Sequence, residues 1–279
     1  MVPSYPAMKR AYFKIINLVY GIAIPAWLLI CAGALEFDVG FKWKLSENVI
    51  PNVTFLSIAI AIETIVFIRL FSRFKKHGKD SALLLASFNA LVITQNLLET
   101  FGNFTGFHEI FGQANENLIF ILVGWSLIFF LLFVQDIFTG GFSFKKHKHT
   151  HLIFSSIIVV LTGFLMVSPF MPAYPSLEVI MNIGFGLMGV LIITLAIWLL
   201  AATNKLAKKA GDQVTRIGLR MIGSSGVLYI AILVSVGLKS LAESISTVLD
   251  IITPILIMAT SIVTYLGYVF PSKKRKEGD

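Results

Sequence analysis

Charged side chains are scarce in this sequence of 279 residues, in which Asp, Glu, Lys and Arg together make up 14%. Soluble globular proteins carry about a quarter of such residues. Hydrophobic residues make up 56% and the mean hydropathy is +0.83, which is more apolar surface than a soluble fold of this length can bury. The composition therefore excludes an ordinary soluble domain and indicates a protein that uses the lipid bilayer as its solvent.

Cysteine and histidine are also rare. Cys31 is the single cysteine, so an intramolecular disulfide is excluded. The five histidines are His77, His108, His147, His149 and His151. None lies within a long apolar run, which argues against a haem held by two histidines inside a membrane. We interpret the last three as part of a solvated basic loop rather than a metal site, and we predict no metal ion and no cofactor.

Eight apolar segments are long enough, or nearly so, to cross the roughly 30 Å of hydrocarbon that needs about 20 helical residues. They cover residues 15–35, 53–71, 82–98, 118–138, 152–170, 179–202, 217–238 and 248–270. The loops between them are too short to fold separately. The prediction is an all-α, polytopic transmembrane helical bundle in one domain, followed by a basic tail at 271–279. If the first segment were a cleaved signal peptide, seven spans would remain.

The placement of basic residues tests this topology, because Lys and Arg collect in cytoplasmic loops. With eight spans and the N-terminus inside, all but Lys42, Lys44 and Lys239 of the 23 basic residues fall on the inner side. Missing or adding one span would move every later loop to the other side. Both termini are therefore predicted to be cytoplasmic, in a plasma or bacterial inner membrane. The net charge of +8 then reflects insertion and contact with anionic lipids, not nucleic-acid binding.

Glu63 is the most informative residue for function, because it lies near the centre of the second predicted span. An ionised carboxylate at that depth costs several kcal/mol unless it is paired or hydrated. We expect Glu63 to face the interior of the bundle and to be protonated or partnered. It is either a proton, cation or ligand site, or a neutral acid that hydrogen-bonds a neighbouring helix.

The third predicted span is the most polar and supplies candidate partners for Glu63. Asn89 and Asn96 are seven residues apart and share a helix face, while Gln95 and Glu99 lie near the outer end. This polar face either lines a hydrated vestibule or forms interhelical hydrogen bonds, which contribute about 1 kcal/mol each. Tyr229 in the seventh span and Asp250 in the eighth are the remaining pocket candidates. Asp250 lies one turn before Pro254, a residue that kinks helices.

Two motifs of small residues are interpreted as helix-packing sites. Gly184, Gly186 and Gly189 spell G-x-G-x-x-G, but the dinucleotide fingerprint requires a preceding strand that is not predicted here. Gly223-Ser224-Ser225-Gly226 is similar to the G-x-S-G motif of rhomboid proteases. A serine nucleophile needs a nearby base, usually histidine, and no predicted span contains one. Small residues at these positions instead allow another helix to approach closely.

The end of the last span reads Tyr265-Leu266-Gly267-Tyr268-Val269-Phe270-Pro271 and leads into basic residues. It resembles the end of the seven-helix sensor regions that precede kinase domains in archaeal and bacterial histidine kinases. The chain departs from that pattern because no kinase domain follows Pro271. The resemblance implies a sensory module that signals through a partner protein.

Three classes of function remain open. The favoured one is a sensor- or receptor-like bundle that acts through partners. The alternative is a small-solute, ion or proton-coupled transporter that uses Glu63. An intramembrane enzyme comes third, because no pair of nucleophile and base and no carboxylate cluster is visible. Membrane lipids are predicted partners, and the sequence leaves homo-oligomerisation open.

Overall fold

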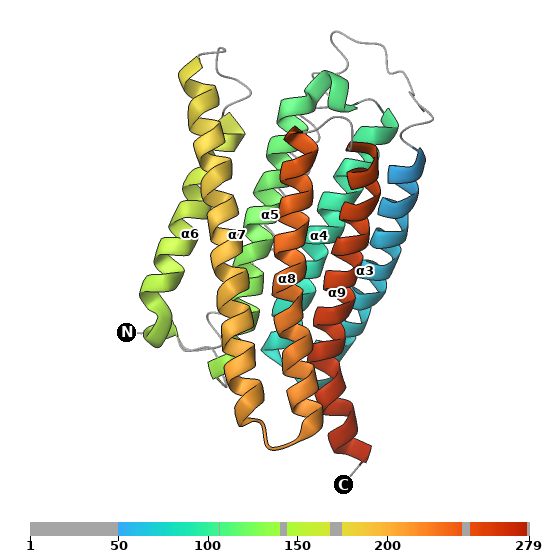
Figure 1. The fold of residues 1–279 in the computed structure, drawn as a ribbon, viewed down its shortest axis with the longest axis vertical. Helices are drawn as coiled ribbons and strands as arrows, with labels where there is room; N and C mark the ends of the chain where they lie inside the picture. The colour runs from blue at the N-terminus through green and yellow to red at the C-terminus, as the bar shows by residue number, and fades with distance from the viewer. Residues whose placement is uncertain (1–49, 106, 140–143, 168–174, 242–245, 278–279) are drawn as a thin grey trace.

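The computed structural model describes residues 50–105, 107–139, 144–167, 175–241 and 246–277, and these residues contain only helices. The seven helices run up and down in an antiparallel bundle (Figure 1). Their bounds are α3 Ile50–His77, α4 Asp80–Thr105, α5 Phe107–Thr139, α6 Phe144–Val167, α7 Pro175–Lys209, α8 Gln213–Leu241 and α9 Ser246–Glu277. The all-α fold predicted from the sequence is confirmed for these residues.

Six of the helices, α3, α4, α5, α7, α8 and α9, are long and apolar enough to cross a membrane. They correspond to six of the eight predicted spans. The predicted span 152–170 falls largely on α6, whose apolar stretch within the described residues, Ile153–Gly163, is shorter than a full span. The first predicted span, 15–35, lies outside the described residues. The count of eight spans therefore stays a prediction.

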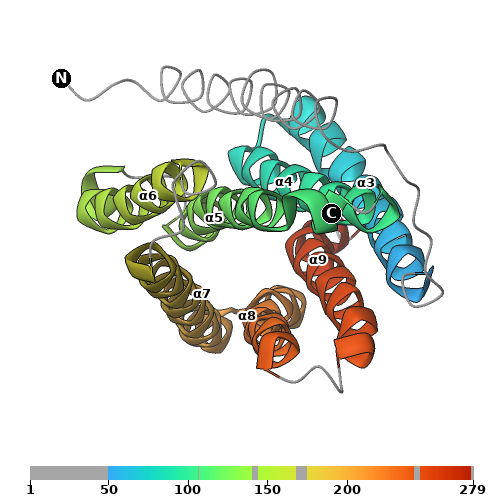
Figure 2. The ribbon, with the colours of Figure 1, turned by 90° about the horizontal axis from the view of Figure 1, so that it is seen from above.

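Helices that follow one another in the chain pack side by side, and α9 closes the bundle by packing against α3 as well as α8. Figure 2 shows α3, α4, α5 and α6 along one side and α9, α8 and α7 along the other. The centre of the bundle is formed by α4 and α5. The buried share of the span is 61% in α4 and 72% in α5, whereas it is 28% in each of the other four membrane-length helices. The polarity of α4 follows from this position, because a central helix does not have to face lipid.

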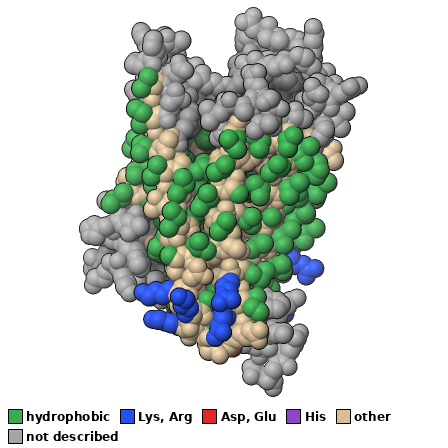
Figure 3. All heavy atoms as spheres, viewed as in Figure 1, with side chains coloured by type: hydrophobic (Ala, Val, Ile, Leu, Met, Phe, Trp, Pro, Cys, Tyr) green, Lys and Arg blue, Asp and Glu red, His purple; other side chains and the backbone are tan. Residues whose placement is uncertain are grey.

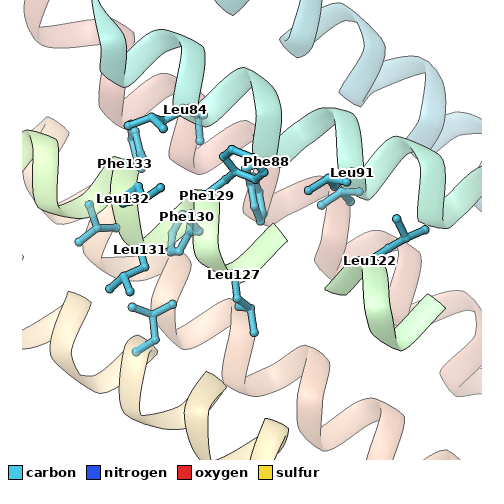
Figure 4. Close-up of a cluster of buried hydrophobic side chains, with 14 of the residues drawn as sticks. Leu84, Phe88, Leu91, Leu122, Leu127, Phe129, Phe130, Leu131, Leu132 and Phe133 are labelled. Carbon is cyan, nitrogen blue, oxygen red and sulfur yellow. The ribbon is translucent and has the colours of Figure 1, made fainter. Parts of the chain in front are cut away.

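An apolar cluster rich in phenylalanine and leucine is centred on α4 and α5 (Figure 4). Phe88 of α4 packs on Phe130 of α5 with a ring-centroid distance of 5.1 Å. Phe130 and Phe133 are both almost completely buried. Aromatic rings in such tilted arrangements add to the dispersion energy that holds membrane helices together.

The two described turns at one end of the bundle are defined by local chemistry. Gly78 ends α3 in the left-handed region at φ 61°, a conformation that glycine adopts without strain. Its amide donates to the Phe74 carbonyl oxygen at 2.7 Å. Asp212 caps α8 by accepting a hydrogen bond from the Thr215 amide at 2.6 Å. These turns place α3 beside α4 and α7 beside α8.

The surface divides into an apolar band and a basic end (Figure 3). Hydrophobic side chains cover the middle of the face that Figure 3 shows, and Ile65, Val160 and Val190 are among the exposed ones. Lys and Arg side chains gather at the end that holds the α3–α4 and α7–α8 turns. We call this the basic end; its exposed described members are Arg69, Lys75, Lys76, Lys79, Lys205, Lys208, Lys209, Arg216 and Arg220.

Candidate functional site

Glu63 lies halfway along α3 and its side chain is 0% exposed. The expectation that it faces the interior is met. Its turn of α3 faces α4 and α9, because α3 packs against both of these helices. The site is therefore at the depth of the apolar band, where water is excluded and electrostatic interactions are strong.

Two polar side chains from two other helices contact the carboxyl group. Asn96 of α4 donates from Nδ2 to Glu63 Oε2 at 3.0 Å. Ser261 of α9 donates from its hydroxyl to Glu63 Oε1 at 3.3 Å. Both partners are buried, at 0% and 3% exposure. We call Glu63, Asn96 and Ser261 the carboxyl site, which joins α3, α4 and α9 through one side chain.

The charge of the carboxyl site is not balanced by a basic side chain among the described residues. The contacts of Glu63 are the two neutral donors, and the nearest arginine in sequence, Arg69, is exposed. A single carboxylate in the membrane interior is rare and is retained mainly where it handles an ion, a proton or a ligand. The Asn96 Oδ1 atom is also buried and has no hydrogen-bond partner in the described part of the chain. Leaving such an acceptor unsatisfied costs about 1–3 kcal/mol.

Tyr229 of α8 was a further candidate from the sequence. Its hydroxyl is buried without a hydrogen-bond partner among the residues described. It lies within electrostatic reach of the Glu63 carboxyl. The ring packs edge-on against Phe130 at 5.1 Å and against Phe88 at 6.1 Å. Tyr229 thus connects the polar site with the aromatic core.

An aromatic column leads from Tyr229 to the basic end. Tyr229 contacts Phe130, Phe130 lies 6.0 Å from Phe133, and Phe133 packs edge-on against Tyr268 at 5.6 Å. The column passes through α8, α5 and α9. Packed rings of this kind transmit a displacement because a close-packed interior yields little.

Tyr268 forms a second junction between the helices of the carboxyl site. Its hydroxyl shares a hydrogen bond with the Ser81 hydroxyl of α4 at 2.9 Å. The Arg73 guanidinium of α3 lies 5.3 Å from the centre of its ring, which is a cation–π distance. We call Arg73, Ser81 and Tyr268 the tyrosine junction. It joins α3, α4 and α9 again, near the basic end.

The other pocket candidates from the sequence are not brought into the carboxyl site by any described hydrogen bond. Asn89 is 1% exposed and donates from Nδ2 to the Leu85 carbonyl oxygen of its own helix at 2.8 Å. Gln95 and Glu99 are partly buried on α4. Asp250 is partly buried near the start of α9. Asn96 forms an interhelical hydrogen bond, which was one of the two predictions for the polar face of this helix. Asn89 forms no hydrogen bond to another helix in the described part of the chain.

The sequence did not single out Ser261, Arg73 or Ser81. Ser261 has no signal of its own, because serine in a membrane helix commonly bonds to its own backbone. Tyr268 lies inside the motif that resembles the end of a sensor region, although nothing in that motif shows that the ring turns inward.

The glycines predicted to be packing sites differ in how closely another helix approaches them. A Cβ at Gly226 would lie 2.7 Å from the Ala196 carbonyl oxygen of α7, and one at Gly184 would lie 2.9 Å from Leu161 of α6. At Gly189 the nearest atom is 3.8 Å away, in ordinary contact. Gly186 is exposed, and a Cβ there would meet no described atom within 4 Å, so its role in packing stays a prediction.

The two serines of the Gly-Ser-Ser-Gly motif bond to their own helix. Ser225 is fully buried, and its hydroxyl donates to the Ile222 carbonyl oxygen at 2.7 Å. Ser224 donates to the Met221 carbonyl oxygen at 2.8 Å and is exposed. Both hydroxyls donate to backbone carbonyl oxygens of α8 in the described structure, and the burial of Ser225 fits a packing role.

A metal centre built from three or more His, Cys, Asp or Glu side chains is not found in the part of the chain that the structure describes. The side chains of His147, His149 and His151 are outside the described ones.

The helices, their apolar exterior and the basic end together define the class: a multi-pass α-helical membrane protein. Comparison of the chain with protein-family models, with curated proteins and with solved structures finds no match in any of the three. Its specific role therefore has to be argued from the carboxyl site itself.

Proposed function

We propose that the protein is a sensor- or receptor-like helical bundle in which Glu63 is the responsive group and a partner protein receives the signal at the basic end. The observation that carries the proposal is that α3, α4 and α9 are joined twice. They meet at the carboxyl site in the middle of the span and again at the tyrosine junction near the basic end.

The geometry of α9 supports coupling between the two places. Ser261 and Tyr268 are seven residues apart, which is two helical turns and roughly 10 Å on one face of the helix. A change in the charge of Glu63 alters its bond to Ser261, and α9 is continuous through both residues. The aromatic column from Tyr229 offers a second mechanical connection.

The proposed topology has eight spans, with both termini in the cytoplasm and the basic end facing it. The basic surface in Figure 3 supports this orientation, because cations are retained on the cytoplasmic side during insertion. A phosphatase fused after Asp279 should be inactive in bacterial cells and a fluorescent protein fused there should be bright. An active phosphatase at that position would reverse the orientation.

The resemblance of the last span to sensor regions of histidine kinases is consistent with this proposal. The motif contributes Tyr268 to the tyrosine junction and Gly267 to the contact with α8. Helix α9 continues through Pro271 to Glu277, so a partner that docks on its end would receive a rigid displacement.

A conformational measurement tests the sensor proposal. Spin labels at Leu266→Cys on α9 and Lys208→Cys on α7, in a Cys31→Ser background, report how α9 moves against a helix that contributes nothing to the carboxyl site. Between alkaline and acidic pH the distance should shift by about 2 Å, the size of typical helix shifts. Glu63→Gln, which mimics the neutral acid, should hold the acidic distance at both pH values.

The variant is the control for the other ionisable groups on the surrounding helices. Among the described residues these include Asp80 and Glu99 on α4, Tyr229 on α8, and Asp250 and Tyr268 on α9. If the distance is the same at both pH values, or if Glu63→Gln follows the native protein, Glu63 is not the responsive group.

A transporter is the second candidate, because a mid-span acid without a basic partner also suits proton coupling. Vesicles that contain the protein and a pH-sensitive dye separate the two. A sensor leaves the internal pH unchanged, whereas a proton-coupled transporter changes it when its solute is supplied and loses this activity in Glu63→Gln.

A further inference from the structure

We propose that the carboxyl site binds one monovalent cation the size of sodium, held by Glu63, Asn96 and Ser261. This inference rests on the proposed function, because it names the species to which the Glu63 site responds. A proton and the cation would compete for the same carboxylate.

The chemistry of the donors selects the kind of ion. The three side chains offer carboxylate, amide and hydroxyl oxygen atoms, which are the ligands of hard cations. The described hydrogen bonds of Glu63 come from the Asn96 amide and the Ser261 hydroxyl, and no group of three or more His, Cys, Asp or Glu side chains forms among the described residues, so soft transition metals lack their preferred ligands. The site carries at most one negative charge, which a single positive charge neutralises and a divalent ion would exceed.

Asn96 provides the independent observation for a ligand. Its side chain is 0% exposed, its Nδ2 contacts Glu63, and its Oδ1 has no hydrogen-bond partner among the described residues. Half a turn of the amide about its last side-chain bond exchanges the two atoms. The same residue therefore donates a hydrogen bond to the carboxylate in one orientation and presents an oxygen to a cation beside the carboxylate in the other.

The position of the three residues explains why an ion would matter to the fold. Each comes from a different helix, so an ion shared by all three oxygens would draw α3, α4 and α9 together. Binding to the folded state alone raises thermal stability in proportion to the logarithm of ion concentration.

The test is the melting temperature of the purified, detergent-solubilised protein at constant ionic strength and alkaline pH. We expect sodium chloride to raise the Tm by about 5 °C over N-methylglucamine chloride when the ion is at 100 times its Kd. Magnesium chloride should not reproduce the shift. Glu63→Gln should abolish the sodium response, and Ser261→Ala, which keeps the carboxylate and the amide, should weaken sodium affinity by about tenfold.

Asn89→Leu is the matched control, because Asn89 is equally buried on the same helix but bonds only to its own backbone in the described structure. It should retain the full sodium response. If sodium and N-methylglucamine give the same Tm, or if Glu63→Gln responds like the native protein, there is no such site. Equilibrium dialysis of the folded native protein with radioactive sodium decides the matter if a variant does not fold, because no bound sodium would mean that there is no such site.

The two proposals fail separately. If the native protein shows no sodium response but its distance between α9 and α7 still depends on pH, the cation site is overturned and the sensor proposal stands. Sodium binding without any movement of α9 would establish the site and overturn the sensor.

Discussion

Gly267→Ala should lower the free energy of unfolding by about 2 kcal/mol, the size of a typical overpacking penalty. A Cβ at this position would lie 2.8 Å from the Gly218 carbonyl oxygen and 2.9 Å from the Ile222 amide nitrogen of α8. Both atoms belong to the backbone, so no side chain can rotate away. The two helices would have to separate and would lose packing along the α8–α9 interface, on which membrane helices depend in the absence of a hydrophobic driving force.

Gly186→Ala is the matched control and should have the opposite sign. Gly186 is exposed in the middle of α7 and has no atom within 4 Å of the added Cβ. Alanine there only removes chain entropy from the unfolded state, which stabilises a helix by roughly 0.5–1 kcal/mol. Unfolding of both variants by sodium dodecyl sulfate in mixed micelles measures the difference. Equal effects would show that α8 and α9 are not in close contact at Gly267.

Asn96→Leu should have the second large effect, a loss of about 1–3 kcal/mol of stability. The substitution removes the donor to Glu63 Oε2 and leaves the buried carboxyl with Ser261 as its described partner. Glu63→Leu combined with Asn96→Leu removes both polar groups, and an apolar pair of similar volume should recover much of the loss. The same unfolding assay gives the coupling energy from the two single variants and the double one.

Asn89→Leu on the same face of α4 serves again as the comparison. Its side chain bonds only within its own helix in the described structure, and its Oδ1 is buried without a partner. Removing that unsatisfied atom should leave stability unchanged or raise it slightly. A destabilisation as large as that of Asn96→Leu would mean that burial of the amide, and not its bond to Glu63, holds α4 in place.

The sequence predicted the helices well because apolar runs of this length have few structural alternatives. It also predicted that Glu63 would turn inward, since the cost of exposing a carboxylate to lipid is large. The role of Asn96 as a partner was one of two readings of its polar helix face. The glycine motif shows which residues are small and not which face meets another helix, so it did not distinguish the exposed Gly186 from the closely packed Gly184.

The remaining parts of the site depend on tertiary neighbours. Ser261 contacts Glu63 because α9, the last described helix, packs against α3, the first described helix. The residue pattern of α9 does not show which helix it meets. The tyrosine junction likewise needs α3, α4 and α9 at one level of the bundle. Single-sequence patterns give the inward face of each helix but not the helix that it meets.

The turn between α7 and α8 has a practical consequence for imaging this protein. Lys205, Lys208 and Lys209 in the last turns of α7 are exposed, so the turn at Gly211 lies at the basic end and not in the apolar band. The helices on both sides of this turn run without interruption into the bundle. A rigid fiducial domain inserted at Gly211 would be held at a fixed angle, which gives a small membrane protein the added mass that single-particle alignment requires.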